Sequence, residues 1–422
     1  MSKPKIRVKG YKDDWEQRKL GEVFDCTIPS NTLSRAELNY ESGSVRNIHY
    51  GDILIKYGSV VDVQNDEIPF ATGKSSDDFK GALLQDGDII IADTAEDETT
   101  GKACEIGNSQ GLDVVSGLHT MVCRPRNKMA LGYLGYYLNS DAYHHQLLPL
   151  MQGIKVLSLS RINVQKTTVC YPESKLEQQL IADCFRNLDH LITLHQRKCD
   201  ETKKLKKYML QKMFPQNGNK VPEIRFFGFT DDWEQRKFGE MASSFEYGLN
   251  AAAKEYDGEN KYIRITDIDD NTHEFLSDSL TSPDIDLTDA EKYKLSTGDI
   301  LFARTGASVG KSYIYRDYDG LVYYAGFLIR ARIKDEYDVE FVFQNTLTDK
   351  YNKYIAVTSQ RSGQPGVNAQ EYSEFKIQVP KKEEQIKIGK YFQNLDHLIT
   401  LHHRKYEELQ KIKKFMLQNM FV

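Results

Sequence analysis

The chain has 422 residues, which is long enough for two to four domains of ordinary size. Apolar residues make up 40 %, the mean hydropathy is −0.56, and no apolar run approaches the roughly 18 residues of a membrane helix, which excludes a membrane-spanning protein. The charged first residues predict that the chain stays in the cytoplasm. The 56 Lys and Arg against 61 Asp and Glu give a net charge of −5, which argues against a protein that covers nucleic acid alone but allows local basic patches.

The chain is a tandem repeat with constant ends and divergent middles. Residues 4–22 (PKIRVKGYKDDWEQRKLGE) return as residues 222–240 (PEIRFFGFTDDWEQRKFGE), with 13 of 19 positions identical. Residues 175–214 return as residues 382–421, with 25 of 40 positions identical and LDHLITLH unchanged. We interpret this pattern as one scaffold that carries two different recognition surfaces; an ordinary duplication is the alternative, although it would diverge more evenly.

The divergent pieces, residues 26–172 and 241–380, have short apolar runs typical of strands, joined by loops rich in Gly, Ser and Thr. The two pieces have a related motif, GDIIIA in the first and GDILFA in the second. Each ends in an extended run, TTVCYP in the first and FKIQVP in the second. One helix is expected in each piece, near 131–148 and near 339–357. Strands are expected at 52–56, 88–92, 114–115 and 119–123, and at 261–266, 299–303, 311–315 and 327–333. The predicted fold class is α+β, with two tandem α/β domains.

The repeated segments after these pieces predict two long helices. Residues 173–214 contain no Pro or Gly and the second copy contains only Gly389, so each helix reaches about 60 Å at 1.5 Å per residue. Apolar residues recur at the 3- and 4-residue spacing of a coiled coil, which predicts that the helices pack against each other. The main positions of this seam are Leu188, Leu191, His195 and Leu205 in the first helix, and Leu395, Leu398, His402 and Ile412 in the second.

Two features of the helices have more than one interpretation. His195 and His402 occupy matching seam positions, where they either fix the register or act as a metal ligand or general base, although partners at a suitable spacing are absent. Residues 197–214 carry seven Lys and Arg against two acids, a net charge of +5. Such a run suits a solvated face, DNA phosphates or an acidic partner.

One motif imitates a nucleotide-binding loop. TGASVGKS (residues 305–312) follows an apolar strand and ends in Gly-Lys-Ser, but the position that needs glycine holds Thr305 and the next segment is of strand type. The first copy keeps Gly101 and Lys102 in an acidic loop. We therefore interpret the shared Gly-Lys as a turn into a strand.

Other catalytic signals are weak or missing. There is no G-x-S-x-G, no H-E-x-x-H and no glycine-rich dinucleotide fingerprint. Asp93, Glu96, Asp97 and Glu98 form either a metal site or, more simply, a solvated acidic loop. The six cysteines lie in the first half without a Cys-x-x-Cys pair, so we expect reduced thiols and no zinc. No catalytic residue, resident cofactor or metal is predicted.

Loops able to contact DNA are what remains. Arg, Lys, Gln and Asn can bond base edges, while Ser and Thr can hold phosphates; the alternative for each is an ordinary surface position. The candidates in the first domain are Lys56, Tyr57, Thr94, His119, Lys155, Ser158, Ser160 and Arg161, and those in the second are Arg304, Thr305, Ser308, Lys311, Gln360, Arg361, Gln364 and Asn368.

Over essentially its whole length the chain resembles the specificity subunit of a type I restriction-modification system. The likeness lies in the paired DDWEQRK segments, in GDIIIA and GDILFARTGASVGK, and in helices where Glu-Gln (177–178, 384–385) precedes Leu-Asp (188–189, 395–396). It implies two target-recognition domains, similar to the DNA-reading domain of an adenine methyltransferase, spaced by an antiparallel coiled coil and without catalysis of their own. It also implies double-stranded DNA and two methyltransferase subunits as partners, to which two restriction subunits can be added, with S-adenosylmethionine, ATP and Mg in those partners.

The expected boundaries are recognition domain 1 at 1–172, spacer helix 1 at 173–214, a linker at 215–222, recognition domain 2 at 223–380 and spacer helix 2 at 381–422. Two domains that differ predict a split, asymmetric target with a fixed gap. Three alternatives stay open: an adaptor that joins two proteins without reading DNA, a nuclease or methyltransferase in its own right, and a modification-only system.

Overall fold

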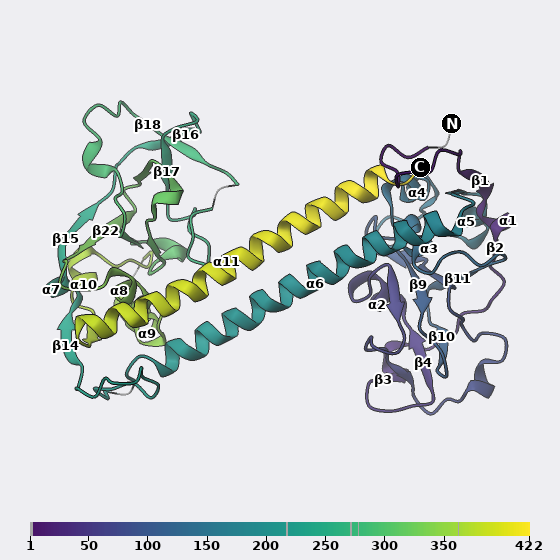
Figure 1. The fold of residues 1–422 in the computed structure, drawn as a ribbon, viewed down its shortest axis with the longest axis horizontal. Helices are drawn as coiled ribbons and strands as arrows, with labels where there is room; N and C mark the ends of the chain where they lie inside the picture. The colour runs from purple at the N-terminus through teal and green to yellow at the C-terminus, as the bar shows by residue number, and fades with distance from the viewer. Residues whose placement is uncertain (1–2, 217, 271, 277, 362) are drawn as a thin grey trace. The chain divides into compact units, whose positions relative to one another are not determined.

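The computed structural model describes residues 3–216, 218–270, 272–276, 278–361 and 363–422. The chain forms two compact units, unit 1 (Met1–Leu194 with Tyr406–Val422) and unit 2 (His195–Lys405) (Figure 1). Two helices of 38 residues each, α6 (Lys175–Lys212) and α11 (Lys382–Asn419), contribute residues to both units. Each unit therefore contains one recognition domain, part of the helix that follows it, and part of the other long helix.

Unit 1 contains a five-stranded sheet of order β2-β11-β7-β9-β5 and a four-stranded sheet of order β10-β4-β6-β3. Two short pairs, β1-β13 and β12-β8, complete the domain. Its elements are β1 (Glu16–Lys19), α1 (Leu20–Val23), β2 (Phe24–Asp25), η1 (Arg35–Glu37), β3 (Leu38–Asn39), β4 (Val45–Ile48), α2 (Tyr50–Ile55), β5 (Val60–Asp62), β6 (Phe70–Ala71), η2 (Ser76–Phe79), β7 (Ile89–Ala92), β8 (Thr94–Ala95), β9 (Ala103–Gly107), β10 (Asp113–Ser116), β11 (Thr120–Pro125), α3 (Tyr133–Leu138), α4 (Asp141–His144), η3 (Leu148–Leu150), β12 (Leu157–Ser158), α5 (Arg161–Gln165) and β13 (Thr168–Tyr171).

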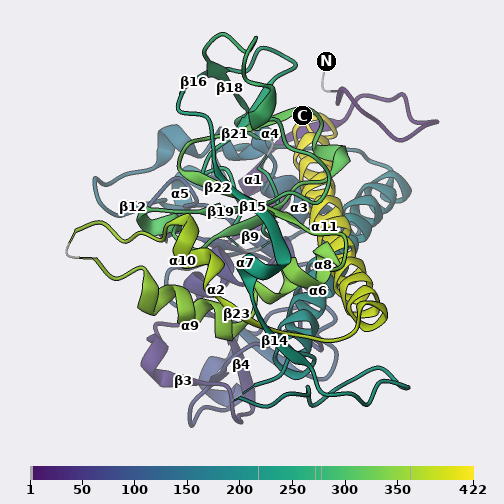
Figure 2. The ribbon, with the colours of Figure 1, turned by 90° about the vertical axis from the view of Figure 1, so that its left-hand side faces the viewer.

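Unit 2 has a four-stranded sheet of order β15-β22-β19-β20 and the pairs β14-β23, β16-β18 and β17-β21 (Figure 2). Its elements are β14 (Glu234–Lys237), α7 (Phe238–Met241), β15 (Ala242–Tyr247), β16 (Ala252–Glu255), β17 (Lys261–Ile263), β18 (Thr281–Asp284), η4 (Glu291–Tyr293), β19 (Ile300–Ala303), η5 (Gly306–Ser308), β20 (Ser312–Ile314), η6 (Asp317–Asp319), β21 (Val322–Tyr324), β22 (Leu328–Ile333), α8 (Val339–Asn345), α9 (Asp349–Thr358), α10 (Ala369–Ser373) and β23 (Lys376–Val379).

The central strands β7 and β19 divide each domain into two cores. Successive side chains of a strand point to opposite faces. Ile89 and Ile91 accordingly belong to the core beneath the long helix, whereas Ile90 and Ala92 belong to the core on the other face. In unit 2, Ile300 and Phe302 lie in one core and Leu301 and Ala303 in the other. A strand buried on both faces must be apolar throughout, which explains the runs IIIA and ILFA.

The Gly-Asp pair before each central strand has a defined role. Gly87 and Gly298 adopt φ values of 92° and 87°, which favour glycine. The Asp88 carboxylate accepts hydrogen bonds from the Gln85 amide and from Arg124 on the neighbouring strand. Asp299 makes the same bonds with Ser296 and Arg332. The motif therefore closes a turn and ties it to β11 or β22.

The constant segment before each domain joins the domain to the start of its long helix. β1 pairs with β13, and β14 pairs with β23, both antiparallel. The Arg7 guanidinium contacts the Glu177 carboxylate at 2.7 Å, and both carboxylate oxygens accept a bond. Arg225 binds Glu384 in the same way. Because both carboxylates are only 1 % exposed, each needs this partner.

The end of the other long helix closes each core. In unit 1 the Trp15 ring packs edge-on against Tyr133 and Phe421, with centroids 6.2 and 6.4 Å apart, and the Ile6 amide donates to the Asn419 carbonyl. In unit 2 Trp233 contacts Phe341 and Phe214 at 5.7 and 6.4 Å, and the Ile224 amide donates to Lys212. The two tryptophans of the sequence thus mark the same site in each unit.

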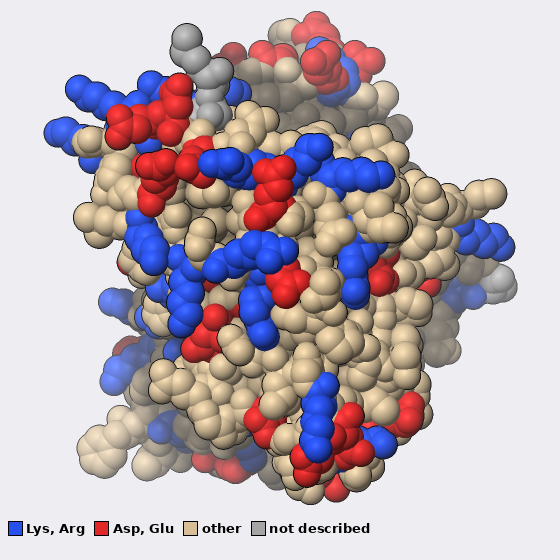
Figure 3. Space-filling model, turned by 90° about the vertical axis from the view of Figure 1, so that its right-hand side faces the viewer, with Lys and Arg blue, Asp and Glu red and all other residues tan. Residues whose placement is uncertain are grey.

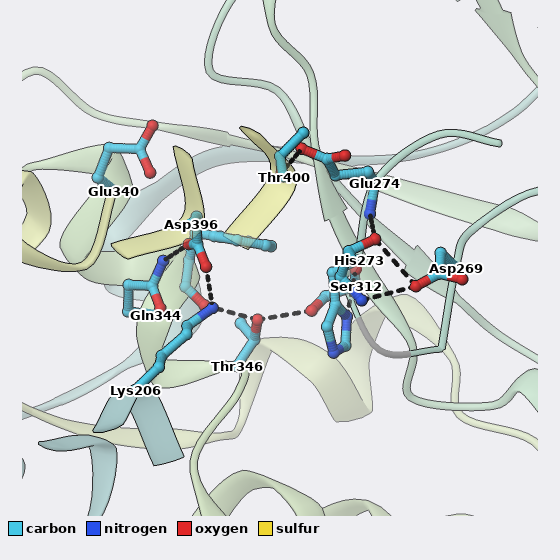
Figure 4. A network of polar contacts seen from close by, with 12 residues as sticks. Lys206, Asp269, His273, Glu274, Ser312, Glu340, Gln344, Thr346, Asp396 and Thr400 are labelled. Carbon is cyan, nitrogen blue, oxygen red and sulfur yellow. Dashed lines mark hydrogen bonds and ion pairs between the residues drawn. The ribbon is translucent and has the colours of Figure 1, made fainter. Parts of the chain in front are cut away.

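Within each unit the long helices run antiparallel, as predicted. In unit 2, Lys206 of α6 binds Asp396 of α11, and His195 lies against His402, so rising numbers on one helix meet falling numbers on the other. In unit 1, Lys413 binds Asp189. Each of these aspartates also accepts a hydrogen bond from its own domain, Asp189 from the Tyr136 hydroxyl and Asp396 from the Gln344 amide (Figure 4). The Leu-Asp motif therefore joins three segments.

The predicted seam needs a correction. Leu395 is buried, Leu188 is half-buried, and both histidines make the contact described below. Leu191, Leu205, Leu398 and Ile412, however, are 39–42 % exposed and lie at the margin of the helix pair. Leu409, which the same spacing also predicts, is 6 % exposed, whereas Cys199 and Ile399, which were not predicted, are buried at 2 % and 5 % exposed. Cys199 Sγ contacts the Ile399 carbonyl across the helix pair, so the helices meet at positions shifted from the predicted seam.

Two secondary-structure predictions were wrong. Residues 52–56 were expected to form a strand but belong to helix α2, which begins where His49 Nδ1 accepts a hydrogen bond from the Gly51 amide; five apolar-rich residues do not distinguish the two structures. The helices expected near 131–148 and 339–357 are each broken in two, α3 with α4 and α8 with α9. The Asn139 side chain bonds the Ala103 carbonyl at one break, and Thr348 caps α9 at the other.

Candidate nucleic-acid interface

In each unit three segments meet at the end of the central strand, and we call this meeting point the junction. In unit 1 the Asp93 amide donates to the His119 carbonyl at 3.1 Å, and the Asp93 carbonyl accepts from the Leu159 amide at 2.8 Å. In unit 2 the Arg304 amide donates to Phe327 at 3.0 Å, and its carbonyl accepts from Val367 at 2.9 Å. The junctions therefore have the same backbone connections but different side chains.

A glycine turn supports each junction from below. The Gly101 amide donates to Ala92 and the Gly310 amide to Ala303, and both glycines have positive φ, 92° and 85°. Strand β9 or β20 begins two residues later. TGASVGKS is thus a short 3₁₀ turn followed by a strand, as expected for a turn rather than for a phosphate-binding loop, which would continue into a helix.

The junction of unit 1 carries an acid, a histidine and aromatic rings. Asp93 Oδ1 accepts a hydrogen bond from the Thr94 hydroxyl and lies 3.7 Å from His119 Nδ1. His119 has a left-handed φ of 54°, and Tyr50 meets its ring edge-on at 5.3 Å. His49 lies beside Tyr50, and burial lowers the pKa of its imidazole. The side chains of Asp93 and His119 are 25 % and 47 % exposed, so both are accessible.

The other candidates of unit 1 fall into two groups. Lys155, Ser158 and Ser160 are exposed on the loop that leads into α5, and Arg161 is half-buried there. Ser160 also caps that helix by accepting from the Asn163 amide. Lys56 is paired with Glu67, and Tyr57 is only 4 % exposed, with a pKa raised by burial. Tyr57 follows α2 and belongs to a core cluster, where its hydroxyl donates to the Glu67 carbonyl, so its burial contradicts the prediction that it contacts DNA.

The junction of unit 2 has a cation between aromatic rings. The guanidinium carbon of Arg304 lies 5.1 Å from the Tyr247 ring centroid and 5.8 Å from that of Phe327. These rings are 42 % and 57 % exposed. Thr305 donates to the Pro365 carbonyl, and Gln364 is exposed beside it. The cation–π contacts hold the guanidinium plane without using its N–H donors.

The remaining candidates of unit 2 are partly engaged in structure. Lys311 binds Asp270, Arg361 binds Glu371, and Asn368 caps α10. Ser308 is half-buried and Gln360 is exposed. The structure thus gathers Arg304, Thr305 and Gln364 at one place, whereas Lys311 and Arg361 are held by carboxylates.

The charge on the surface is mixed. In Figure 3, Lys and Arg side chains cross the face that is in view, with Asp and Glu among them. All six cysteines have free thiols. Within the described residues no three His, Cys, Asp or Glu side chains form a possible metal site. No helix in the described part of the chain has the length and apolarity to span a bilayer.

Sequence reasoning missed the aromatic parts of both junctions and the position of Asp93, which we had placed in an acidic loop. A signal was present, because Asp93 and Arg304 directly follow the matching strands IIIA and ILFA. Tyr247 and Phe327 gave no such signal, since Tyr247 ends β15 and Phe327 directly precedes β22, and only the pairing of these strands brings the two residues together.

Comparison with known sequences decides the family. The family described as "Type I restriction modification DNA specificity domain" matches residues 12–204 and again residues 230–411. The chain belongs to this family. The double match covers most of the sequence and confirms the tandem organisation, and family members of this kind are not themselves catalytic.

Two relatives illustrate the likeness. A putative specificity subunit of the type I restriction enzyme MjaX of Methanocaldococcus jannaschii is 27 % identical over 197 residues, which is 45 % of this chain and 46 % of that protein. The match thus spans about half of the curated relative. The crystal structure of a type I restriction-modification S subunit from M. genitalium aligns over 100 % of this chain and 99 % of the other, with 14 % identity and a TM-score of 0.67. This second likeness confirms the predicted fold class of two tandem domains with two paired helices.

Proposed function

We propose that this chain is the DNA-recognition subunit of a type I restriction-modification complex. Each recognition domain reads one half of a split, asymmetric target through its junction and the loop beside it. The observation that supports this proposal most strongly is that two copies of the family's specificity domain keep one backbone at the junction and differ in its exposed side chains. A protein that recognised the same surface twice would have no reason to diverge there. No finding favours the adaptor alternative.

We propose further that two adenine-N6 methyltransferase subunits dock on the chain and supply S-adenosylmethionine, and that restriction subunits with ATP and Mg can complete the complex. The chain then contributes binding and position, while chemistry belongs to its partners. With double-stranded DNA as its proposed target, the complex is proposed to act in the cytoplasm. We place recognition domain 1 at 1–172 and recognition domain 2 at 223–380, with the spacer helices at 173–214 and 381–422.

The first experiment is to co-express the chain with the methyltransferase encoded beside it and to map N6-methyladenine across the host genome by long-read sequencing. We expect one split motif with a constant gap, which appears only when the chain is present. A soluble complex that adds no methylation would contradict the proposal and would revive the adaptor alternative.

The spacing role of the helices can be tested separately. A seven-residue helical insertion after Lys198, with a matching one after His402, adds two turns or about 10 Å to both partners of the pair. We expect the gap to lengthen by about 3 base pairs at 3.4 Å per pair, with both half-sequences unchanged. The control is a seven-residue insertion in the linker at 215–222, which should leave the gap as it was. A changed half-sequence would contradict the spacer role.

A further inference from the structure

The junctions differ in the charge of one structurally equivalent residue. Asp93 and Arg304 each follow the last residue of the central strand, and each makes the same two backbone hydrogen bonds with its neighbouring segments. His119 and Phe327 are equivalent in turn, since Thr120 pairs with Ala92 and Leu328 pairs with Ala303 in the same register. The same backbone position therefore presents a carboxylate in one domain and a guanidinium in the other.

Arg304 is unusual among the arginines of its domain. Arg264, Arg316, Arg330, Arg332 and Arg361 all pair with carboxylates. Among the described residues, Arg304 makes no such pair and lies between two exposed aromatic rings instead. A guanidinium that lies against aromatic rings and donates no side-chain hydrogen bond within the described residues matches the O6 and N7 acceptors of guanine in the major groove.

Asp93 has the opposite chemistry at the equivalent place. Its contacts with Thr94 and His119 both fall on Oδ1, while Oδ2 makes no hydrogen bond within the described part of the chain. The side chain is partly exposed and is positioned by these neighbours. A carboxylate oriented in this way can accept a hydrogen bond from the N4 amino group of cytosine.

We propose that Asp93 and Arg304 are the equivalent specificity-determining residues of the two domains. Arg304 selects a guanine in one half-site, and Asp93 selects a cytosine at the corresponding position of the other. Tyr247 and Phe327 are positioning residues for Arg304, and Thr94 and His119 are positioning residues for Asp93. This inference rests on the proposed function, because it requires that the domains read DNA.

The test uses the complete complex with its methyltransferase and two readouts. The first is the methylation motif in the host, and the second is the Kd for duplexes that carry each of the four base pairs at the position concerned. Arg304→Ala should make one guanine of one half-site degenerate and leave the other half-site intact. Asp93→Ala should do the same for one cytosine of the other half-site. The discrimination in Kd at that position should fall about 10- to 100-fold.

Further variants separate base reading from general damage. Arg304→Gln should shift the preference from guanine toward adenine, which a destabilised domain would not do. Phe327→Ala should reduce the discrimination without changing the preferred base. The controls are Arg236→Ala, on the constant strand β14, and Glu96→Ala, an exposed acid that directly follows β8; both should keep the full motif.

The outcomes distinguish this inference from the proposed function. If the unmodified complex has a split motif but Arg304→Ala, Arg304→Gln and Asp93→Ala all keep it unchanged, the assignment of these residues is wrong and the function stands. If either single variant alters both half-sites, the assignment to separate domains is wrong. If the unmodified complex has no motif that depends on the chain, the proposed function itself fails.

Discussion

The two units differ least where they hold the long helices and most at the junctions. Arg7 with Glu177 and Arg225 with Glu384 are the same pair in both units, and Trp15 and Trp233 contact equivalent rings. The junctions differ, because that of unit 1 has an acid with a histidine and that of unit 2 has an arginine with two aromatic rings. The constant residues are buried and bonded to several segments at once, so a change in one leaves the others unsatisfied. The junction side chains are accessible, so they can change without loss of the fold.

The largest effect is expected from replacing one variable piece with the other. In a chain in which a second copy of residues 241–380 replaces residues 26–172, β1 loses β13 but receives β23, the partner of β14, whose sequence EQRK is identical to that of β1. The constant segments remain in both units. We expect both halves of the target to carry the sequence now read by the second domain, measured as the methylation motif of the reconstituted complex. The control is a chain made by the same cloning procedure, in which residues 241–380 are rewritten with synonymous codons so that the protein sequence is unchanged. A change in neither half, from a folded complex, would contradict independent recognition.

The constant ion pairs should be equally important in the two units. Arg7→Ala leaves the Glu177 carboxylate buried without its partner, and Arg225→Ala does the same to Glu384. Removing one partner of a buried pair costs about 3–5 kcal/mol. We expect both variants to lower the free energy of unfolding of their unit by a similar amount, measured by denaturant titration with fluorescence. Arg236→Ala, whose partner Glu234 is exposed, should change it by under about 1 kcal/mol.

Strongly unequal losses from Arg7→Ala and Arg225→Ala would show that the two scaffolds are not equivalent.

A smaller effect is expected from the pH dependence of stability, in which the core of unit 1 should differ from that of unit 2. Glu105 of β9 accepts hydrogen bonds from the Gly132 and Gly135 amides at the start of α3, where burial raises its pKa to about 7. The position equivalent to Glu105 in unit 2 is Ile314 of β20, because Ile314 follows the turn glycine Gly310 at the same interval as Glu105 follows Gly101. There Asp338 caps the corresponding helix, α8, instead. Because the folded-state pKa exceeds the ordinary value, this group favours folding at low pH, and its contribution is lost as pH rises from about 4.5 through 7.

We therefore expect unit 1 to lose stability over this pH range through Glu105, and Glu105→Gln to remove that part of the pH dependence. Truncation to alanine should cost about 1–3 kcal/mol, since two buried amides lose their acceptor. Thermal unfolding between pH 4.5 and 7 measures both effects, with Ile314→Val as the control in unit 2. An unchanged pH profile in Glu105→Gln would contradict the assignment.

The smallest expected effect concerns the histidine pair. His195 Nδ1 and His402 Nδ1 lie 3.0 Å apart, so one ring must donate and the other accept, and only neutral rings or a singly protonated pair can do this. Burial, helped by His195 and Lys198, lowers the pKa of His402. A lowered folded-state pKa means that stability is present above about pH 6.5 and is lost as pH falls below it.

The contribution of this pair to the unfolding midpoint should therefore drop slightly between pH 7 and 5, opposite in direction to the contribution of Glu105. His402→Gln should flatten this drop, because an amide can donate and accept at either pH. His397→Gln, on the exposed face of the same helix, is the control. If His402→Gln and His397→Gln change the pH dependence of the unfolding midpoint equally, the histidine pair is not the cause of that dependence. The interpretation that the two histidines fix the helix register then stays a prediction.

Several features were predictable because they depend on patterns along the chain. The repeats, the long helices and their ability to pair follow from sequence identity and from the spacing of apolar residues, whereas the antiparallel direction was implied by the family resemblance. The strands IIIA and ILFA were correctly placed, since a strand buried on both faces has to be apolar throughout. Residues 52–56 were not, because short apolar runs suit a strand or a helix equally until a capping side chain such as His49 selects one.

By itself the sequence determined that this protein has two related domains, two long helices and no recognisable active site, since these properties are written as repeats, periodicity and motifs. Tertiary structure decided which residues meet. Asp93 and His119 are separated by 26 positions and Arg304 and Tyr247 by 57, and only the register of the strands brings each pair together. The same is true of the helix seam, where Cys199 and Ile399 meet and are buried while Leu191 and Leu398 lie at the margin. Contacts between distant segments depend on how sheets and helices pack, which local sequence patterns do not encode.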